Sequence, residues 1–141
     1  MSITKYREDF LLLAEAGFIA INQADEDATK KLFAAAALLN KSNVLPKIGT
    51  GYLHLHKLEL KQAVKCFEEV LEQEPNNEMA EAFMGLCISL MPEGATRGER
   101  MLEQSLKSKD PTLKKMAGTA LDFIDQHVKG SSPASAPRKR K

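Results

Sequence analysis

The sequence predicts an all-α protein in which three helical hairpins repeat at a fixed interval and a final helix covers the last hairpin. Gly17, Gly51 and Gly85 are evenly spaced, and Phe33 and Phe67 are separated by the same interval. Apolar residues recur at intervals of three, four and seven, which is the spacing of one helical face. No alternating pattern typical of strands accompanies them. A fixed period of about 34 residues indicates a stacked repeat architecture.

The first hairpin is expected to comprise helices over residues 6–22 and 27–40. Apolar residues of the first helix share one face. Residues 23–27 (Gln-Ala-Asp-Glu-Asp) interrupt the apolar pattern and place acidic groups at the next N-terminus, where the helix dipole favours them. The second helix contains four alanines at 34–37, and such small side chains let a neighbouring helix approach closely.

The second hairpin is expected to comprise helices over residues 44–57 and 60–73. Ser42 or Asn43 is the expected N-cap of the first of these helices. Pro46 then falls in the first turn, where its missing N–H is harmless.

The third hairpin is expected to comprise helices over residues 78–91 and 96–108, and the covering helix spans residues 111–128. Asp110 and Pro111 are a strong start signal for the covering helix, with aspartate as the N-cap and proline as the first helical residue. A repeat array needs such a helix because its terminal apolar face otherwise meets water.

The middle unit carries a small residue, an alanine, an aromatic residue and a proline at fixed places: Gly51, Ala63, Phe67 and Pro75. This pattern resembles the tetratricopeptide repeat, a helix–turn–helix unit of about 34 residues. The repeats span about residues 10–43, 44–77 and 78–110.

The flanking units match this pattern less closely. The first unit keeps Gly17 and Phe33, and the third unit keeps Gly85. The second half of the third unit is expected to slip by about two residues after the loop at 91–95.

The resemblance implies a right-handed superhelix that forms one domain over residues 1–129, including the capping helix. Residues 130–141 are rich in serine, proline and alanine and end in four basic residues, so we expect this tail to be disordered. The tail is interpreted either as a solubilising extension or as a tag for nuclear import or an anionic surface.

Composition limits the classes of partner and compartment. Residues 1–130 hold 16 basic and 19 acidic residues, which disfavours nucleic acid as the main ligand. The apolar run from 10 to 21 is too short to span a membrane. Cys66 and Cys87 lie in apolar helical patterns and are predicted to be buried free thiols, which suits a reducing compartment. Without a visible secretory signal, we expect a cytoplasmic location.

The tetratricopeptide resemblance implies a concave groove formed by the first helix of each unit. Its expected residues are Leu11, Ala14, Phe18, Ile21, Leu45, Ile48, Tyr52, Leu55, His56, Met79, Ala82, Leu86 and Leu90. This mostly apolar set favours an amphipathic helix or a hydrophobic segment as the ligand. An empty groove of this kind favours a homodimer or a cochaperone. For Ile48, Leu55 and Leu86, a place in the core is an equally good interpretation.

No catalytic, cofactor or metal constellation emerges from the sequence, so an enzyme is disfavoured. His54 and His56 are two residues apart on a helix and point about 200° apart, so they cannot share a metal ion. His54 is expected to be a packing residue with a hydrogen bond.

Ser108, Asp110 and Pro111, followed by a helix with Met116 and Phe123, are similar to the ending of type III secretion needle-subunit chaperones. That resemblance implies a bacterial cytoplasmic chaperone. It implies that the protein, with a small helical cochaperone, sequesters the amphipathic helix of a needle subunit and prevents its polymerisation. The alternatives are a type III translocator chaperone and a general repeat adaptor between folded proteins.

Overall fold

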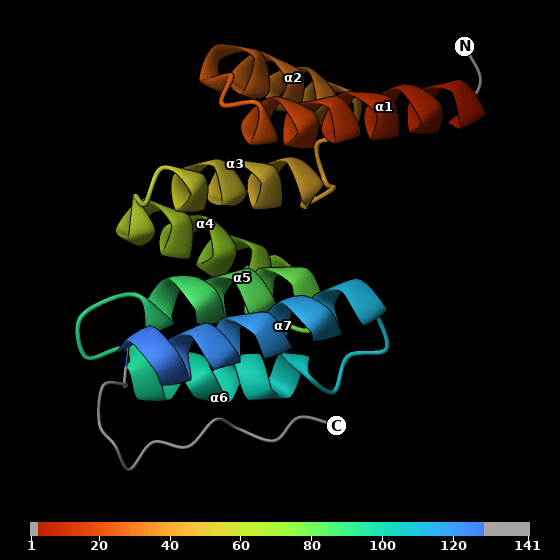
Figure 1. Ribbon diagram of the computed structural model, residues 1–141. Helices are drawn as coiled ribbons and strands as arrows, with labels where there is room; N and C mark the ends of the chain where they lie inside the picture. The colour runs from red at the N-terminus through yellow and green to blue at the C-terminus, as the bar shows by residue number, and fades with distance from the viewer. Residues whose placement is uncertain (1–2, 129–141) are drawn as a thin grey trace. The chain divides into compact units, whose positions relative to one another are not determined.

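The computed structural model describes residues 3–128, and this range folds into seven α-helices and one π-helical turn without any strand (Figure 1). The predicted all-α class is therefore confirmed. The chain divides into two compact units, with the boundary between Gln73 and Glu74. The tail predicted at 130–141 lies outside the described residues.

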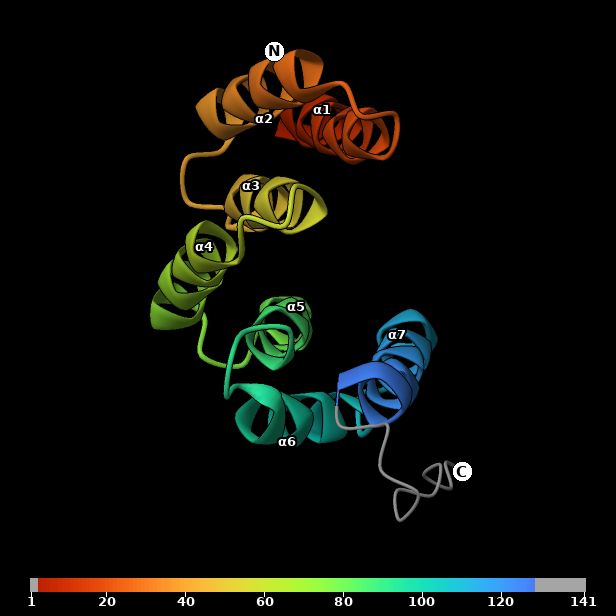
Figure 2. The same ribbon diagram turned by 60° about the vertical axis from the view of Figure 1, so that its left-hand side comes forward.

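Unit 1 contains two antiparallel hairpins. Helices α1 (Ile3–Asn22) and α2 (Glu26–Leu39) form the first, and α3 (Leu45–His56) and α4 (Leu60–Gln73) form the second (Figure 2). Helix α3 packs on both α1 and α2, which joins the two hairpins. The core at this junction consists of Ile21, Phe33 and Leu53, with Phe18 and Tyr52 packed against it.

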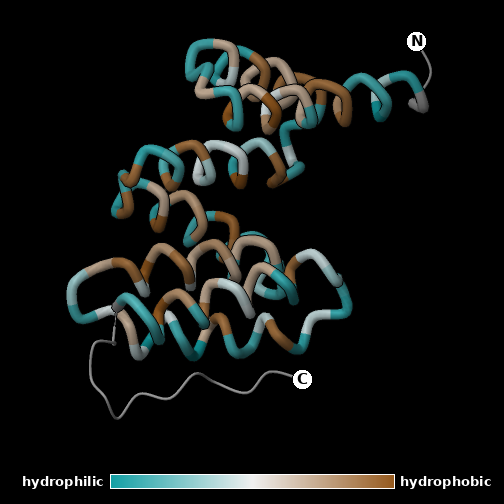
Figure 3. The backbone as a smooth tube through the Cα atoms, viewed as in Figure 1, coloured by the Kyte–Doolittle hydropathy of each residue, from teal (hydrophilic) through white to brown (hydrophobic). Residues whose placement is uncertain are grey.

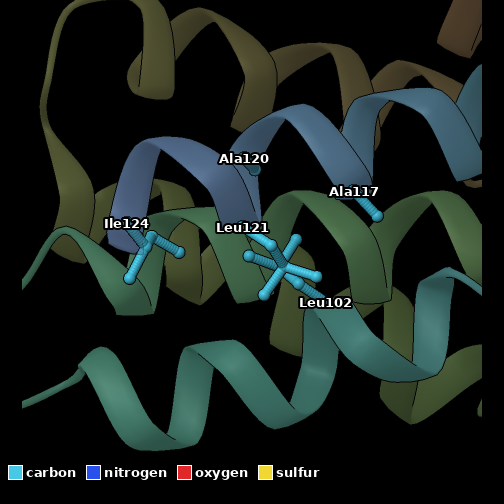
Figure 4. Close-up of a cluster of buried hydrophobic side chains, with 5 residues drawn as sticks. All are labelled: Leu102, Ala117, Ala120, Leu121 and Ile124. Carbon is cyan, nitrogen blue, oxygen red and sulfur yellow. The ribbon is translucent and has the colours of Figure 1, made fainter. Parts of the chain in front are cut away.

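Unit 2 contains one hairpin and the covering helix. Helices α5 (Glu78–Ser89) and α6 (Ala95–Ser105) form the hairpin, and α7 (Pro111–Phe123) packs on both. The helix continues into the π-helical turn at Ile124–Val128. The core of the unit contains five buried residues from α6, α7 and the π-helical turn (Figure 4): Leu102, Ala117, Ala120, Leu121 and Ile124.

Apolar and polar residues alternate along the helices of both units, as expected of helices with one packed face (Figure 3). Most helix ends agree with the prediction to within three residues. Asp110 caps α7 as expected, since its side chain accepts a hydrogen bond from the Thr112 N–H at 2.9 Å. The N-cap expected at Ser42 or Asn43 is wrong, because α3 starts after Val44, which has no side-chain cap.

The turn between the two helices of each hairpin contains a residue with left-handed backbone geometry. These residues are Ala24, Leu58 and Glu93, with φ of 58°, 60° and 60°. Ala24 and Leu58 are separated by the same interval as Gly17 and Gly51, and Glu93 lies one position beyond the next such interval. The hairpins therefore share a left-handed turn residue, and the third turn, residues 90–94, is two residues longer than the turns at 23–25 and 57–59.

The buried face of the second helix recurs with the same intervals. The matching triplets are Thr29, Phe33 and Ala36 in α2; Ala63, Phe67 and Val70 in α4; and Gly98, Leu102 and Ser105 in α6. The step from α2 to α4 equals the glycine interval, and the step from α4 to α6 exceeds it by one. The predicted slip of about two residues is thus corrected to one. The α5–α6 turn is two residues longer, and α5 ends one residue earlier relative to Gly85 than α3 does relative to Gly51.

Replacing Leu58 by glycine is expected to raise the free energy of unfolding of unit 1 by about 1 kcal/mol, because a non-glycine residue at positive φ is strained by roughly that amount. The Leu58 side chain is 72% exposed, so little packing is lost. Leu12→Gly is the matched control, since this exposed leucine lies inside α1, where glycine costs about 1 kcal/mol. Urea denaturation measures both, and two changes of the same sign would contradict the strain argument.

Candidate functional site

Four of the predicted groove residues in unit 1 belong to the core instead. Ala14, Ile21, Ile48 and Leu55 are buried, so their side chains offer almost no surface to a partner. Ile21 packs in the cluster that joins the two hairpins. The expectation that these four residues contact a ligand is therefore corrected: they position the helices that carry the exposed residues.

Three other predicted residues form a row of rings across α1 and α3. The ring of Phe18 lies edge-on to the buried Phe33 with centroids 5.1 Å apart, and its other neighbour is Tyr52 at 5.9 Å. His56 follows Tyr52 at 6.2 Å. The Tyr52 hydroxyl donates a hydrogen bond to Asn22 Oδ1 at 3.3 Å, which ties α3 to the end of α1.

Phe18 and Tyr52 are half-buried, His56 is exposed, and the predicted residues Leu11 and Leu45 lie on the same two helices. Leu11 is 51% exposed and Leu45 is half-buried. These five residues are called the α1–α3 face below. The face combines apolar and aromatic surface with a ring nitrogen, and it contains no charged carboxylate or ammonium of its own.

The predicted groove residues of unit 2 have a different environment. Ala82 is buried, and Leu86 packs against the core cluster that α7 contributes to (Figure 4). The groove assignment of Ala82 is corrected, because its buried side chain offers almost no surface to a partner. Leu86 is half-buried, and the cluster it packs against includes residues of α7. Met79 and Leu90 are half-buried.

The sequence reasoning missed three exposed apolar residues of α1: Tyr6, Leu12 and Ile19. With Leu11, they make four of the seven large hydrophobic side chains that are exposed among the described residues. The interval of seven between Leu12 and Ile19 was a usable signal, because residues seven apart share a helical face. Helix α1 is therefore the most apolar exposed element of the described chain.

A polar network lies beside this face at the end of α3. The Lys57 ammonium is 2.8 Å from Glu26 and 3.4 Å from Glu59, and His54 Nδ1 is 2.8 Å from Glu59. The hydrogen bonds from Lys57 and Lys30 hold the pKa of Glu26 below its usual 4.5, and the bond with His54 does the same for the pKa of Glu59. The stabilisation from both carboxylates is present above pH 4.5 and is lost as pH falls through their lowered values. The predicted hydrogen bond of His54 is confirmed.

Burial lowers the reactivity of both thiols. Cys87 is buried, and desolvation raises its pKa to about 12, while burial also raises the pKa of the half-buried Cys66. Because the thiolate is the reactive form, we expect native protein at pH 8 to leave Cys87 unlabelled by a maleimide and to label Cys66 slowly. Both should react at once in denaturant. Mass spectrometry of intact protein checks this, and rapid double labelling of the native state would contradict it.

Within residues 3–128, no three histidine, cysteine or acidic side chains are grouped closely enough to hold a metal ion. In the same range, none of the helices combines the length and the apolar character that crossing a membrane requires.

Comparison with known proteins gives no family model, no curated protein and no solved structure that matches this chain.

Proposed function

We propose that this protein is a helical-repeat chaperone that holds the amphipathic helix of a secreted subunit against the α1–α3 face. In this proposal the three hairpins are tetratricopeptide-like repeats in a right-handed superhelix capped by α7. The protein acts in the bacterial cytoplasm without catalysis, and its client is a type III secretion needle subunit, assisted by a small helical cochaperone.

One observation carries the proposal: four of the seven exposed large apolar side chains of the described residues lie on α1, and the half-buried rings of Phe18 and Tyr52 connect α1 with α3. Full burial of a large apolar side chain contributes about 1.5–3 kcal/mol, so a helix that covers several of them gains a favourable term that offsets part of the cost of association. An apolar helix laid into an apolar surface is a recurrent recognition mode. The aromatic rings add area at low conformational cost because they have few rotatable bonds.

The regular design of the hairpins supports the repeat part of the proposal. Turn geometry, buried triplets and close glycine contacts recur at the same places. A carbon atom added to Gly17 would lie 2.8 Å from Phe33, and one added to Gly51 would lie 2.7 Å from Phe67. Such contacts set the distance between the two helices of a hairpin.

Blocking assembly follows from the same physics. A subunit that polymerises through an apolar helix is kept single when that helix is covered by another apolar surface. Release for export requires that the affinity be finite. An exposed face with half-buried rings suits this need better than a closed cavity does.

The proposal predicts that Leu11→Glu combined with His56→Glu abolishes co-purification with a type III needle subunit expressed in the same cells. Both side chains are exposed, so the fold is preserved, while two carboxylates on the face oppose burial of an apolar helix. Leu38→Glu is the control, because Leu38 is a 75% exposed leucine on α2, outside the α1–α3 face.

Affinity purification followed by gel filtration reports complex formation, and circular dichroism verifies the helical content of each variant. Retention of the needle subunit by the double variant would show that the face is not its binding site. Loss of the needle subunit from the Leu38→Glu control would show that binding is non-specific and hydrophobic. Capture of folded proteins unaffected by either change would favour the adaptor alternative.

A further inference from the structure

A pocket of about 400 Å³ opens beside the N-terminal half of α1 in unit 1. Tyr6, Phe10 and Leu11 of α1 line it together with Leu39 at the end of α2. Tyr6 and Leu11 are two of the exposed large apolar side chains of α1. The pocket therefore collects apolar surface for which the described chain supplies no cover.

The size of the pocket suits a side chain or a small group rather than a whole helix. Its volume is at the lower end of the range of about 300–1,000 Å³ in which ligands are enclosed by proteins. An aliphatic or aromatic side chain that enters such a pocket becomes largely buried, and buried anchors of this kind dominate the affinity of protein interfaces.

The charge at the pocket is positive and unpaired. Arg7 lines the pocket and has no ion pair among residues 3–128, whereas its neighbours Lys5 and Asp9 pair with each other at 3.2 Å. Lys41, in the loop after α2, is exposed and also has no ion pair in that range. Asn43 at the pocket wall already uses its Oδ1 to accept a hydrogen bond from the Leu45 N–H at 2.8 Å.

We propose that this pocket anchors one bulky apolar side chain of a partner helix, and that Arg7 pairs with an aspartate or glutamate one turn away on that helix. The inference rests on the proposed function, since Leu11 belongs to both the pocket and the α1–α3 face. It adds a chemical requirement that the face alone does not impose: the partner is acidic where it meets α1. Guanidinium–carboxylate pairs supply the geometric selectivity.

Two synthetic amphipathic peptides test the proposal. Both carry the same leucine face, and their polar positions are glutamate in one peptide and lysine in the other. They are titrated into the isotope-labelled full chain at low salt. We expect the glutamate peptide to bind about tenfold more tightly, the ratio typical of one charge-assisted contact. Its binding should shift the amide signals of Tyr6, Leu11 and Leu39.

Arg7→Glu is expected to reverse this preference in favour of the lysine peptide. Lys65→Glu changes the net charge equally on the exposed side of α4 and should leave the preference intact. Equal binding of the two peptides, or a loss of preference in both variants, overturns the pocket proposal.

The position of the shifts separates this inference from the proposed function. Shifts at Phe18 and Tyr52 without shifts at the pocket overturn the pocket proposal and leave the function standing. Shifts confined to the pocket overturn the α1–α3 face as the helix site and leave the anchor standing. If neither peptide binds, both the pocket proposal and the proposed function are overturned.

Discussion

Replacing Gly49 by alanine is expected to lower the free energy of unfolding of unit 1 by about 3 kcal/mol, at the upper end of the usual cost of overpacking. A Cβ atom on Gly49 would lie 2.1 Å from Phe33 Cζ and 2.5 Å from the two adjacent ring atoms. The ring cannot move away, because Phe33 is buried and Phe18 packs edge-on against it. The two hairpins of unit 1 must separate locally to admit one methyl group.

A double-mutant cycle isolates this contact. Phe33→Leu shortens the side chain that the new methyl group meets, so Gly49→Ala should cost much less in that background than in the parent protein. Urea denaturation followed by circular dichroism gives all four free energies. An equal cost in both backgrounds, or a cost below about 0.5 kcal/mol in the parent, would show that Gly49 does not set the distance between the hairpins.

The repeat interval was visible in the sequence, and the contact that joins the hairpins was not. Gly17 and Gly51 can be recognised in the sequence by their regular spacing, and each contacts the aromatic residue of its own hairpin. Gly49 has no glycine partner at that spacing, and its neighbour Phe33 belongs to the preceding hairpin. Periodicity reports contacts that recur within a unit, whereas a contact between units becomes visible once the helices are placed.

The candidate site shows the same limit more sharply. Phe18, Tyr52 and Leu86 occupy equivalent places in the three repeats, so pattern reasoning treats them alike. All three are half-buried, but Phe18 and Tyr52 pack against the cluster that joins the two hairpins of unit 1, whereas Leu86 packs against the cluster built with α7. The difference arises because Phe18 and Tyr52 neighbour each other, whereas Leu86 has α7 beside it. The covering helix was predicted, but the side of α5 that it occupies was not.

The sequence indicates the cause of the one-residue slip in the third hairpin, but it does not indicate how many residues the slip comprises. The loop at 90–94 contains Pro92 and Gly94, which indicate a turn longer than those of the first two hairpins. The register of the next helix depends on which residue of the loop adopts the left-handed conformation. That residue is Glu93. Leu102 consequently replaces the preceding residue, Met101, as the buried counterpart of Phe67.

Replacing Leu121 by alanine is expected to lower the free energy of unfolding of unit 2 by about 3 kcal/mol, a typical cost for a large-to-small change in a core. Leu121 is fully buried in the cluster with Leu102 and Ile124 (Figure 4). Its loss leaves a cavity at the place where α7 meets the hairpin. Lys115→Ala is the control, because Lys115 is exposed on the same helix and its replacement should change stability by less than about 0.5 kcal/mol.

The same variant distinguishes core from groove at Leu86. When the packing of α7 on the hairpin is weakened, the apolar side of α5 becomes exposed to solvent. Binding of a hydrophobic dye such as ANS should therefore rise in Leu121→Ala and stay unchanged in Lys115→Ala. A fully stable Leu121→Ala protein with unchanged dye binding would mean that α7 does not cover α5 in solution. Leu86 would then count among the candidate partner-binding residues.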